Sequence, residues 1–219
     1  SHSVCDGYDS VLSYLLHISV CRWVCERVRV GSRASLLAYR TGLRSGMTSA
    51  QTSSAAFKRD CYATITTLLH VIGAVTSCVQ AQAHRLLTAR HYVDKDTDQV
   101  DMSLVEVQRI HMRMMTELVR ILAALQPALL PLLRTACGFA ERYVALLRLE
   151  AQFEGEAAFE LSAAPCKKLQ VALLRTKDAM HDFVVALHRL VTESSMRVDP
   201  SPADSADVSA LKQLEIKLR

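Results

Sequence analysis

Apolar residues recur every three or four positions along most of this 219-residue chain, the spacing that lines one face of an α-helix. The first such segment predicts a helix over residues 10–44, with a bend at Gly31. Residues 45–54 are small and polar and predict a loop. The next segment predicts a helix over residues 55–93, whose apolar positions are Phe57, Cys61, Ile65, Leu68, Ile72, Val75, Val79 and Leu86.

Polar residues and prolines divide the middle of the chain. A polar break at residues 94–99 precedes a helix that begins near Asp101. Pro127 and Pro131 predict a kink or a restart in this helix, because proline lacks the N–H that the helix ladder needs. A further helix is predicted over residues 132–161.

The last part of the chain predicts two helices joined by a linker. Pro165 suits the N-terminus of a helix over residues 166–194. Residues 197–207 are rich in Pro, Ser and Asp and predict a linker, and residues 208–219 predict a short amphipathic helix. That helix docks either on its own chain or on another protein. The chain is therefore predicted to be all-α, with a bundle over residues 1–196.

The stretch from Cys61 to His84 contains no Asp, Glu, Lys or Arg. Its length would suffice to cross a membrane. Its Thr, Ser, Gln and His side chains, however, make it too polar to face lipid on all sides. A helix buried among other helices, at the centre of a bundle or at a dimer interface, is the favoured interpretation.

Composition supports a helical, core-forming protein and excludes some partners. Half of the residues are apolar, and 7 Gly and 5 Pro are too few for the tight turns of an all-β protein. The net charge of +4 is small for a nucleic-acid-binding protein. Basic and aromatic residues do not alternate in a way that would stack bases, so no nucleic-acid partner is expected.

The seven cysteines are odd in number, lack a CxxC pair and fall mostly in apolar helical segments. This pattern is typical of reduced thiols in the core of an intracellular protein. The first residues, Ser1-His2-Ser3, show neither the basic region nor the apolar region of a signal peptide. A cytoplasmic location is therefore expected.

Motifs that would indicate catalysis or metal binding are weak. His17, Cys21 and Cys25 are spaced i, i+4, i+8 and would supply three zinc ligands, but a polar-tolerant strip on a packed helix is the favoured reading. Asp178 and Asp182 lack the Glu-x-x-His motifs of a di-metal bundle. No Gly-rich phosphate loop, HExxH or GxSxG occurs, so we expect no enzyme, metal or cofactor.

The most distinctive pattern is a stripe of arginines on the first predicted helix. Its members fall within about 60° of arc at 100° per residue, and they are Arg22, Arg29, Arg33, Arg40 and Arg44. The opposite side carries the apolar residues Val20, Trp23, Val24 and Ala34, which we expect to pack inward. The stripe is either an ordinary solvated face or a surface for an anionic partner. Further basic candidates are Lys167 and Lys168.

The order of these elements resembles the BAR domain of the BAR–PH Arf GTPase-activating and adaptor proteins. The matching residues on the second predicted helix are Phe57, Leu68, Leu69, His70, Gln80 and Tyr92-Val93, followed by Asp94-Lys95-Asp96. The later segment ERYVALLRLEAQFEGE resembles the third helix of that family. The resemblance covers residues 10–96, and 139–190 more weakly.

The resemblance implies an elongated antiparallel bundle of long helices that forms a homodimer. It places the charge-free second helix at the dimer core, with Phe57, Ile65, Leu68, Ile72, Val75 and Val79 as candidates. The arginine stripe would then face anionic phospholipid. The predicted function is a non-enzymatic, peripheral membrane scaffold for membrane shaping or trafficking. The alternative is a helical adaptor that binds protein partners and has no lipid role.

Overall fold

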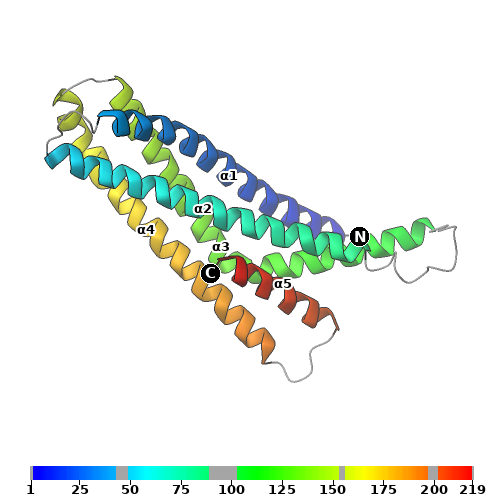
Figure 1. Ribbon diagram of the computed structural model, residues 1–219. Helices are drawn as coiled ribbons and strands as arrows, with labels where there is room; N and C mark the ends of the chain where they lie inside the picture. Colours follow the sequence, from blue (N-terminus) through cyan, green and yellow to red (C-terminus); the bar gives the residue numbers. More distant parts are fainter. Residues whose placement is uncertain (1, 43–48, 89–102, 153–155, 197–201, 219) are drawn as a thin grey trace. The chain divides into compact units, whose positions relative to one another are not determined.

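The computed structural model describes residues 2–42, 49–88, 103–152, 156–196 and 202–218. These residues form five helices and no strand (Figure 1), namely α1 (His2–Gly42), α2 (Ser49–Thr88), α3 (Leu104–Gln152), α4 (Glu156–Ser195) and α5 (Pro202–Leu218). The predicted all-α class is confirmed. The expected loop over residues 45–54 is wrong for residues 49–54, which belong to α2, and residues 45–48 lie outside the described residues.

Helix α3 continues through both prolines, so the predicted restart at residue 132 is wrong. Pro127 and Pro131 are exposed and four residues apart, which places them on the solvent side of the helix. The carbonyl groups that lose their N–H partner therefore reach water, while Leu125, Leu129 and Leu132 remain buried on the other side. At its start, Ser103 caps α3, because its hydroxyl accepts a hydrogen bond from the Glu106 N–H (3.3 Å).

Two other predicted boundaries also differ from the structure. The helix predicted over residues 132–161 is divided, since α3 ends at Gln152 and α4 begins at Glu156. Pro165 lies inside α4 and not at its start, because the preceding segment EAAFELSAA is rich in strong helix formers. Helix α5 begins at Pro202, where a proline fits the first helical turn, so the predicted linker loses its second half.

The helices divide into two compact units. Unit 1 contains Ser1–Ile18, Gly73–Leu129 and Val184–Arg219, and unit 2 contains Ser19–Ile72 and Leu130–Phe183. The boundary within α3 falls between its two prolines. Each unit has its own apolar core.

Unit 2 is built from segments of α1 to α4, and consecutive helices run antiparallel (Figure 1). Buried hydroxyl groups tie neighbouring helices together. The Tyr143 hydroxyl of α3 donates to the Lys58 carbonyl of α2 (3.4 Å), and the Thr176 hydroxyl of α4 donates to the Thr135 carbonyl of α3 (3.3 Å). The largest fully buried side chains of this unit are Ile65, Leu68, Ile72, Leu132, Phe139, Tyr143, Leu146 and Leu169, with Phe183.

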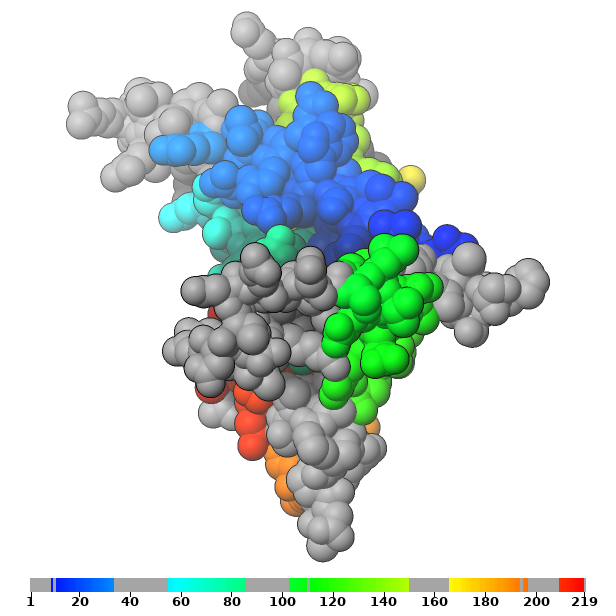
Figure 2. Space-filling model, turned by 90° about the vertical axis from the view of Figure 1, so that its right-hand side faces the viewer, coloured from blue at the N-terminus to red at the C-terminus, as the bar shows by residue number. Residues whose placement is uncertain are grey.

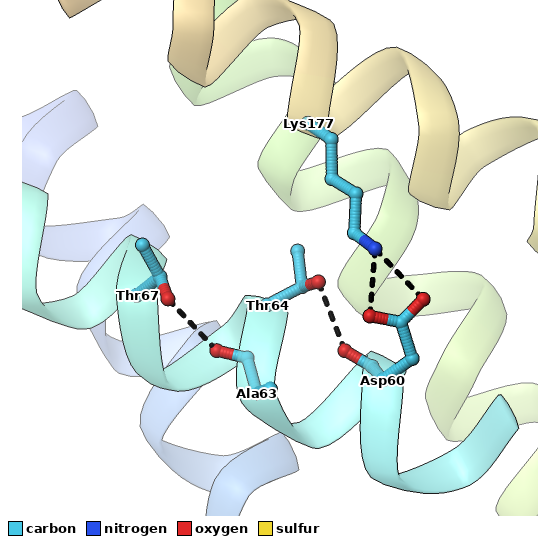
Figure 3. Close-up of polar contacts among 5 residues, drawn as sticks. All are labelled: Asp60, Ala63, Thr64, Thr67 and Lys177. Atoms are coloured by element: carbon cyan, nitrogen blue, oxygen red, sulfur yellow. Dashed lines mark hydrogen bonds and ion pairs between the residues drawn. The ribbon is translucent and has the colours of Figure 1, made fainter. Parts of the chain in front are cut away.

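An ion pair joins α2 to α4 in unit 2 (Figure 3). The Lys177 Nζ contacts both carboxylate oxygens of Asp60, at 2.6 and 2.7 Å. Both side chains are partly exposed, and such a pair contributes about 0–1 kcal/mol to stability. Along the same turns of α2, the hydroxyls of Thr64 and Thr67 donate to the carbonyls of Asp60 and Ala63 (2.9 and 3.0 Å). Threonines in the charge-free stretch are thus satisfied by their own helix.

Unit 1 contains α5 together with segments of α1 to α4. The Cys78 Sγ of α2 donates to the Ala210 carbonyl of α5 (3.4 Å), and the His188 Nδ1 of α4 lies 2.8 Å from a carboxylate oxygen of Glu215. Leu214 is fully buried. The C-terminal helix therefore docks on its own chain, where it contacts α2 and α4.

Candidate functional site

Helix α1 buries a different face from the one predicted. Its buried residues are spaced alternately three and four apart, and they are Val11, Tyr14, Ile18, Cys21, Cys25, Val28 and Ser32. The expected inward residues Val20 and Trp23 are 49% and 59% exposed, so that prediction is wrong. At 100° per residue, Trp23 lies about 160° from Cys21 around the helix. Cysteine packs as a small apolar residue, and the two cysteines complete the buried seam.

The arginine stripe is exposed where the structure describes it. Arg22 and Arg33 are exposed, and within the described residues neither forms an ion pair. Arg29 is paired with Glu26, with 2.8 Å between Nε and Oε2, and this ion pair raises the pKa of the Arg29 guanidinium. The side chain of Arg40, and Arg44 as a whole, lie outside the described residues. Two of the five stripe positions are therefore shown to present an unpaired charge.

An aromatic and apolar surface lies beside the stripe on α1. The guanidinium of Arg27 is 5.0 Å from the centre of the Trp23 ring, which is a cation–π contact. Val30 is 67% exposed on the same side of the helix. In the space-filling view the described part of α1, in blue, forms a continuous surface (Figure 2). This helix therefore presents arginines and exposed apolar side chains together.

A groove of about 390 Å³ runs between α1 and α3 within unit 2. Its lining residues are Trp23, Val24, Arg27, Val28 and Gly31 from α1 and Val144, Leu147 and Arg148 from α3. The lining is apolar apart from two guanidinium groups. Neither Arg27 nor Arg148 has an acidic partner in the described part of the chain. We call these eight residues the α1–α3 groove.

The sequence did not predict the α1–α3 groove. Arg27 follows Trp23 by four residues, which is a helical-face pairing that the spacing does indicate. The sequence around the α3 residues, however, does not indicate that they pack against α1. Only packing brings the two walls together.

The predicted zinc ligands lie in different surroundings. His17 is exposed, with its Nδ1 2.7 Å from the Ser13 carbonyl oxygen, whereas Cys21 and Cys25 are buried. No group of three or more metal-binding side chains is present among the described residues. Asp178, His181 and Asp182 are all exposed on α4. Lys167 and Lys168 are likewise exposed near the first described side chains of that helix.

The six cysteines whose side chains the structure describes are free thiols. A hydrogen bond with Cys137 lowers the pKa of Cys21, but a hydrogen bond with Cys25 and burial outweigh it and raise the pKa to about 12. Burial raises the pKa of Cys61 to about 12 as well. The thiols of Cys21 and Cys61 therefore stay protonated at neutral pH and are poor nucleophiles.

The candidate dimer-core residues are covered by this chain's own helices. Phe57 is half-buried, and the others, Ile65, Leu68, Ile72, Val75 and Val79, are buried. Their burial does not require a second copy. A dimer that forms through α2 would use its outer face instead.

Two stretches, Ala55–Arg85 and Leu104–Leu149, are long and apolar enough to cross a membrane. In their most apolar windows, 50% and 39% of the residues are buried inside the protein. Core helices of soluble proteins meet the same criterion, so this is weak evidence for a membrane span.

Comparison with known proteins identifies no relative. No protein-family model, no curated protein and no solved structure matches this chain. Its functional interpretation therefore depends on the residues themselves.

Proposed function

We propose that this chain is a non-enzymatic helical module that homodimerises and binds anionic membrane surfaces through α1. The observation that carries the proposal is the exposed surface of α1, where Arg22 and Arg33 lie beside Trp23 and Val30. Arginines bind lipid phosphates, and tryptophan favours the boundary between headgroups and acyl chains. A surface with both kinds of side chain suits a peripheral membrane protein.

The magnitude of the lipid attraction explains why a dimer belongs to the proposal. A basic residue near an anionic surface contributes about 1 kcal/mol, so Arg22, Arg27 and Arg33 together contribute about 3 kcal/mol. That corresponds to a dissociation constant weaker than about 1 mM. Two copies would contribute about 6 kcal/mol, which brings the constant to tens of micromolar.

The outer face of α2 supports a dimer contact. In unit 2, beyond Arg59 at its N-terminal end, this face exposes Ala63, Thr66, Thr67 and His70 and carries no Asp, Glu, Lys or Arg. Interface cores are depleted of charge, so this surface suits a second copy better than the charged faces of the other helices do. The BAR-like arrangement is part of the same proposal, and the sequence pattern described above supports it.

Vesicle co-sedimentation tests the membrane proposal. The wild type should sediment with vesicles of anionic phospholipid and remain in solution with zwitterionic ones. Arg22→Glu/Arg33→Glu should reduce the bound fraction at least tenfold, because it replaces two attractive charges by repulsive ones. Raising the salt concentration should weaken binding of the wild type.

A matched control separates the α1 surface from general charge. Arg134→Glu/Arg142→Glu makes the same charge change at two exposed positions of α3. It should leave vesicle binding within about twofold, since neither position belongs to the α1 surface that the proposal assigns to the membrane. Equal losses in both variants would contradict the assignment to α1.

Light scattering tests the homodimer separately. The expected mass is twice that of one chain, and Thr67→Arg should shift it towards one chain by placing a charge in the contact. A single-chain mass for the wild type would reject the dimer. Absence of sedimentation with anionic vesicles would reject the membrane proposal and favour the protein-binding adaptor.

A further inference from the structure

We propose that the α1–α3 groove binds a single-chain anionic amphiphile, such as a fatty acid or a lysophospholipid with an anionic headgroup. The acyl chain would lie along Val24, Val28, Val144 and Leu147. The headgroup would be held by the guanidinium groups at the rim. This site does not depend on the proposed membrane-surface binding, because it takes one dissolved molecule and not a bilayer.

The size of the groove fits one acyl chain. Its volume of about 390 Å³ lies within the usual range for small-molecule sites. A methylene group is similar in size to a water molecule, whose share of liquid volume is about 30 Å³, so the groove accommodates about a dozen methylenes. From Trp23 to Gly31 the α1 wall is about 12 Å long at 1.5 Å per residue. This is short for a docked helix.

The charge of the rim selects an anionic headgroup. Arg27 and Arg148 line the groove from opposite helices, and both lack acidic partners in the described part of the chain. A guanidinium pairs with a carboxylate or a phosphate through two parallel hydrogen bonds. A neutral or zwitterionic amphiphile would leave this attraction unused.

Trp23 makes the groove observable. It is the only tryptophan of the chain, it lines the groove and it is 59% exposed. An acyl chain that covers the indole ring would remove it from water and shift its fluorescence to shorter wavelength. Because no other tryptophan contributes, the signal reports this site alone.

The test is a fluorescence titration of the full chain with dodecyl phosphate below its micelle concentration. A saturable blue shift is expected. Dodecyl phosphocholine, which has the same chain but a zwitterionic headgroup, should bind at least tenfold more weakly. Inorganic phosphate should give no shift, because the headgroup alone lacks the apolar contact. A linear, unsaturable response to dodecyl phosphate would overturn the proposal.

Two variants locate the site. Gly31→Leu fills the groove from α1, and it should not strain the fold because a Cβ at Gly31 meets no atom within 4 Å. Arg148→Gln removes one of the two cations. Each should weaken dodecyl phosphate binding at least tenfold. Arg142→Gln, on the same helix but outside the groove, is the matched control and should bind within twofold of the wild type.

The outcomes separate this proposal from the membrane proposal. Unchanged binding by both Gly31→Leu and Arg148→Gln, with wild-type helix content by circular dichroism, would overturn the groove assignment. Gly31→Leu should still sediment with anionic vesicles to the extent that the wild type does. Arg22→Glu/Arg33→Glu should lose vesicle binding and still bind dodecyl phosphate as the wild type does.

Discussion

Cys21 and Cys25 lie in the buried seam of α1, and this position turns Trp23 towards solvent. The sequence pattern placed Trp23 on the inward side because it lies with Val20 and Val24 on the apolar side away from the arginine stripe. In the structure a third side of the helix is buried instead. The cysteines supply the three-and-four spacing that fits between neighbouring helices, and Trp23 is left to line the α1–α3 groove.

The hydroxyl of Tyr14 is buried and has no hydrogen-bond partner among the described residues. Burial also raises its pKa to about 12. Tyr14→Phe should therefore increase the free energy of unfolding at pH 7 by about 1 kcal/mol, because an unsatisfied polar group is removed. Urea denaturation measures this change.

The pH dependence gives the same variant a second readout. Folding raises the pKa of this phenol from its ordinary value of 10 to about 12, so the unfolded chain loses the proton first, and the free energy of unfolding falls as the pH rises from about 10 through about 12. Tyr14→Phe should thus lose less stability than the wild type between these two pH values. Tyr143→Phe is the contrasting control, because its hydroxyl donates to the Lys58 carbonyl, and it should destabilise by about 1 kcal/mol. A destabilised Tyr14→Phe would show that the hydroxyl has a partner.

Helix α3 shows that a local break signal can be overridden at the scale of an element. Proline inside a helix costs about 3 kcal/mol relative to alanine. The helix tolerates two of them because they share its exposed side, while a run of leucines packs on the opposite side. The two prolines indicate a break, but the burial of leucines on the opposite face of the helix stabilises a continuous helix.

Replacing these prolines should stabilise the chain. Pro131→Ala restores an N–H donor for the Pro127 carbonyl and should raise the free energy of unfolding by about 1–2 kcal/mol, less than the full helix penalty because alanine also loosens the unfolded chain. Chemical denaturation is the measurement, and Gln126→Ala, at an exposed position of the same helix, should change stability by less than about 0.5 kcal/mol. A destabilised Pro131→Ala would indicate that the core requires the local geometry of the proline.

At the scale of the whole molecule, the C-terminal helix belongs to the core of unit 1. Helix α5 covers Cys78 of α2, and Leu214 of α5 is fully buried. An amphipathic helix after a Pro/Ser segment is equally compatible with docking on another protein. The buried contacts of α5 within unit 1 favour docking in the same chain.

Loosening α5 should expose Cys78. Leu214→Ala removes a fully buried side chain, which typically costs about 2–5 kcal/mol, and should increase the rate of maleimide labelling at Cys78 at least tenfold. Peptide mapping by mass spectrometry measures the rate at this cysteine. Ile216→Ala is the matched control, because Ile216 is 71% exposed on the same helix, and its labelling rate should equal that of the wild type. A wild-type rate that falls as protein concentration rises would instead indicate docking between chains.

Much of the fold was predictable because helical periodicity is a local property. The three-and-four spacing of apolar residues determined the all-α class, and it placed Ile65, Leu68 and Ile72 on a buried face. The exposed charges of Arg22 and Arg33 also agree with the predicted stripe. Helix ends were less predictable. Pro165 was expected at a helix start but lies inside α4, and Pro202 was expected in a linker but begins α5, because the flanking residues decide where a helix starts.

The α1–α3 groove could not be predicted, because its walls come from segments far apart in the chain. Periodicity shows that a helix has an apolar side, but it does not show which neighbour covers that side or which residues are left uncovered. By itself the sequence determined the helices and their basic stripe. Tertiary packing decided that Trp23 faces outward, that Arg27 and Arg148 line one groove and that α5 docks on α2 and α4. The physical reason is that burial depends on contacts between helices, whereas spacing acts within one helix.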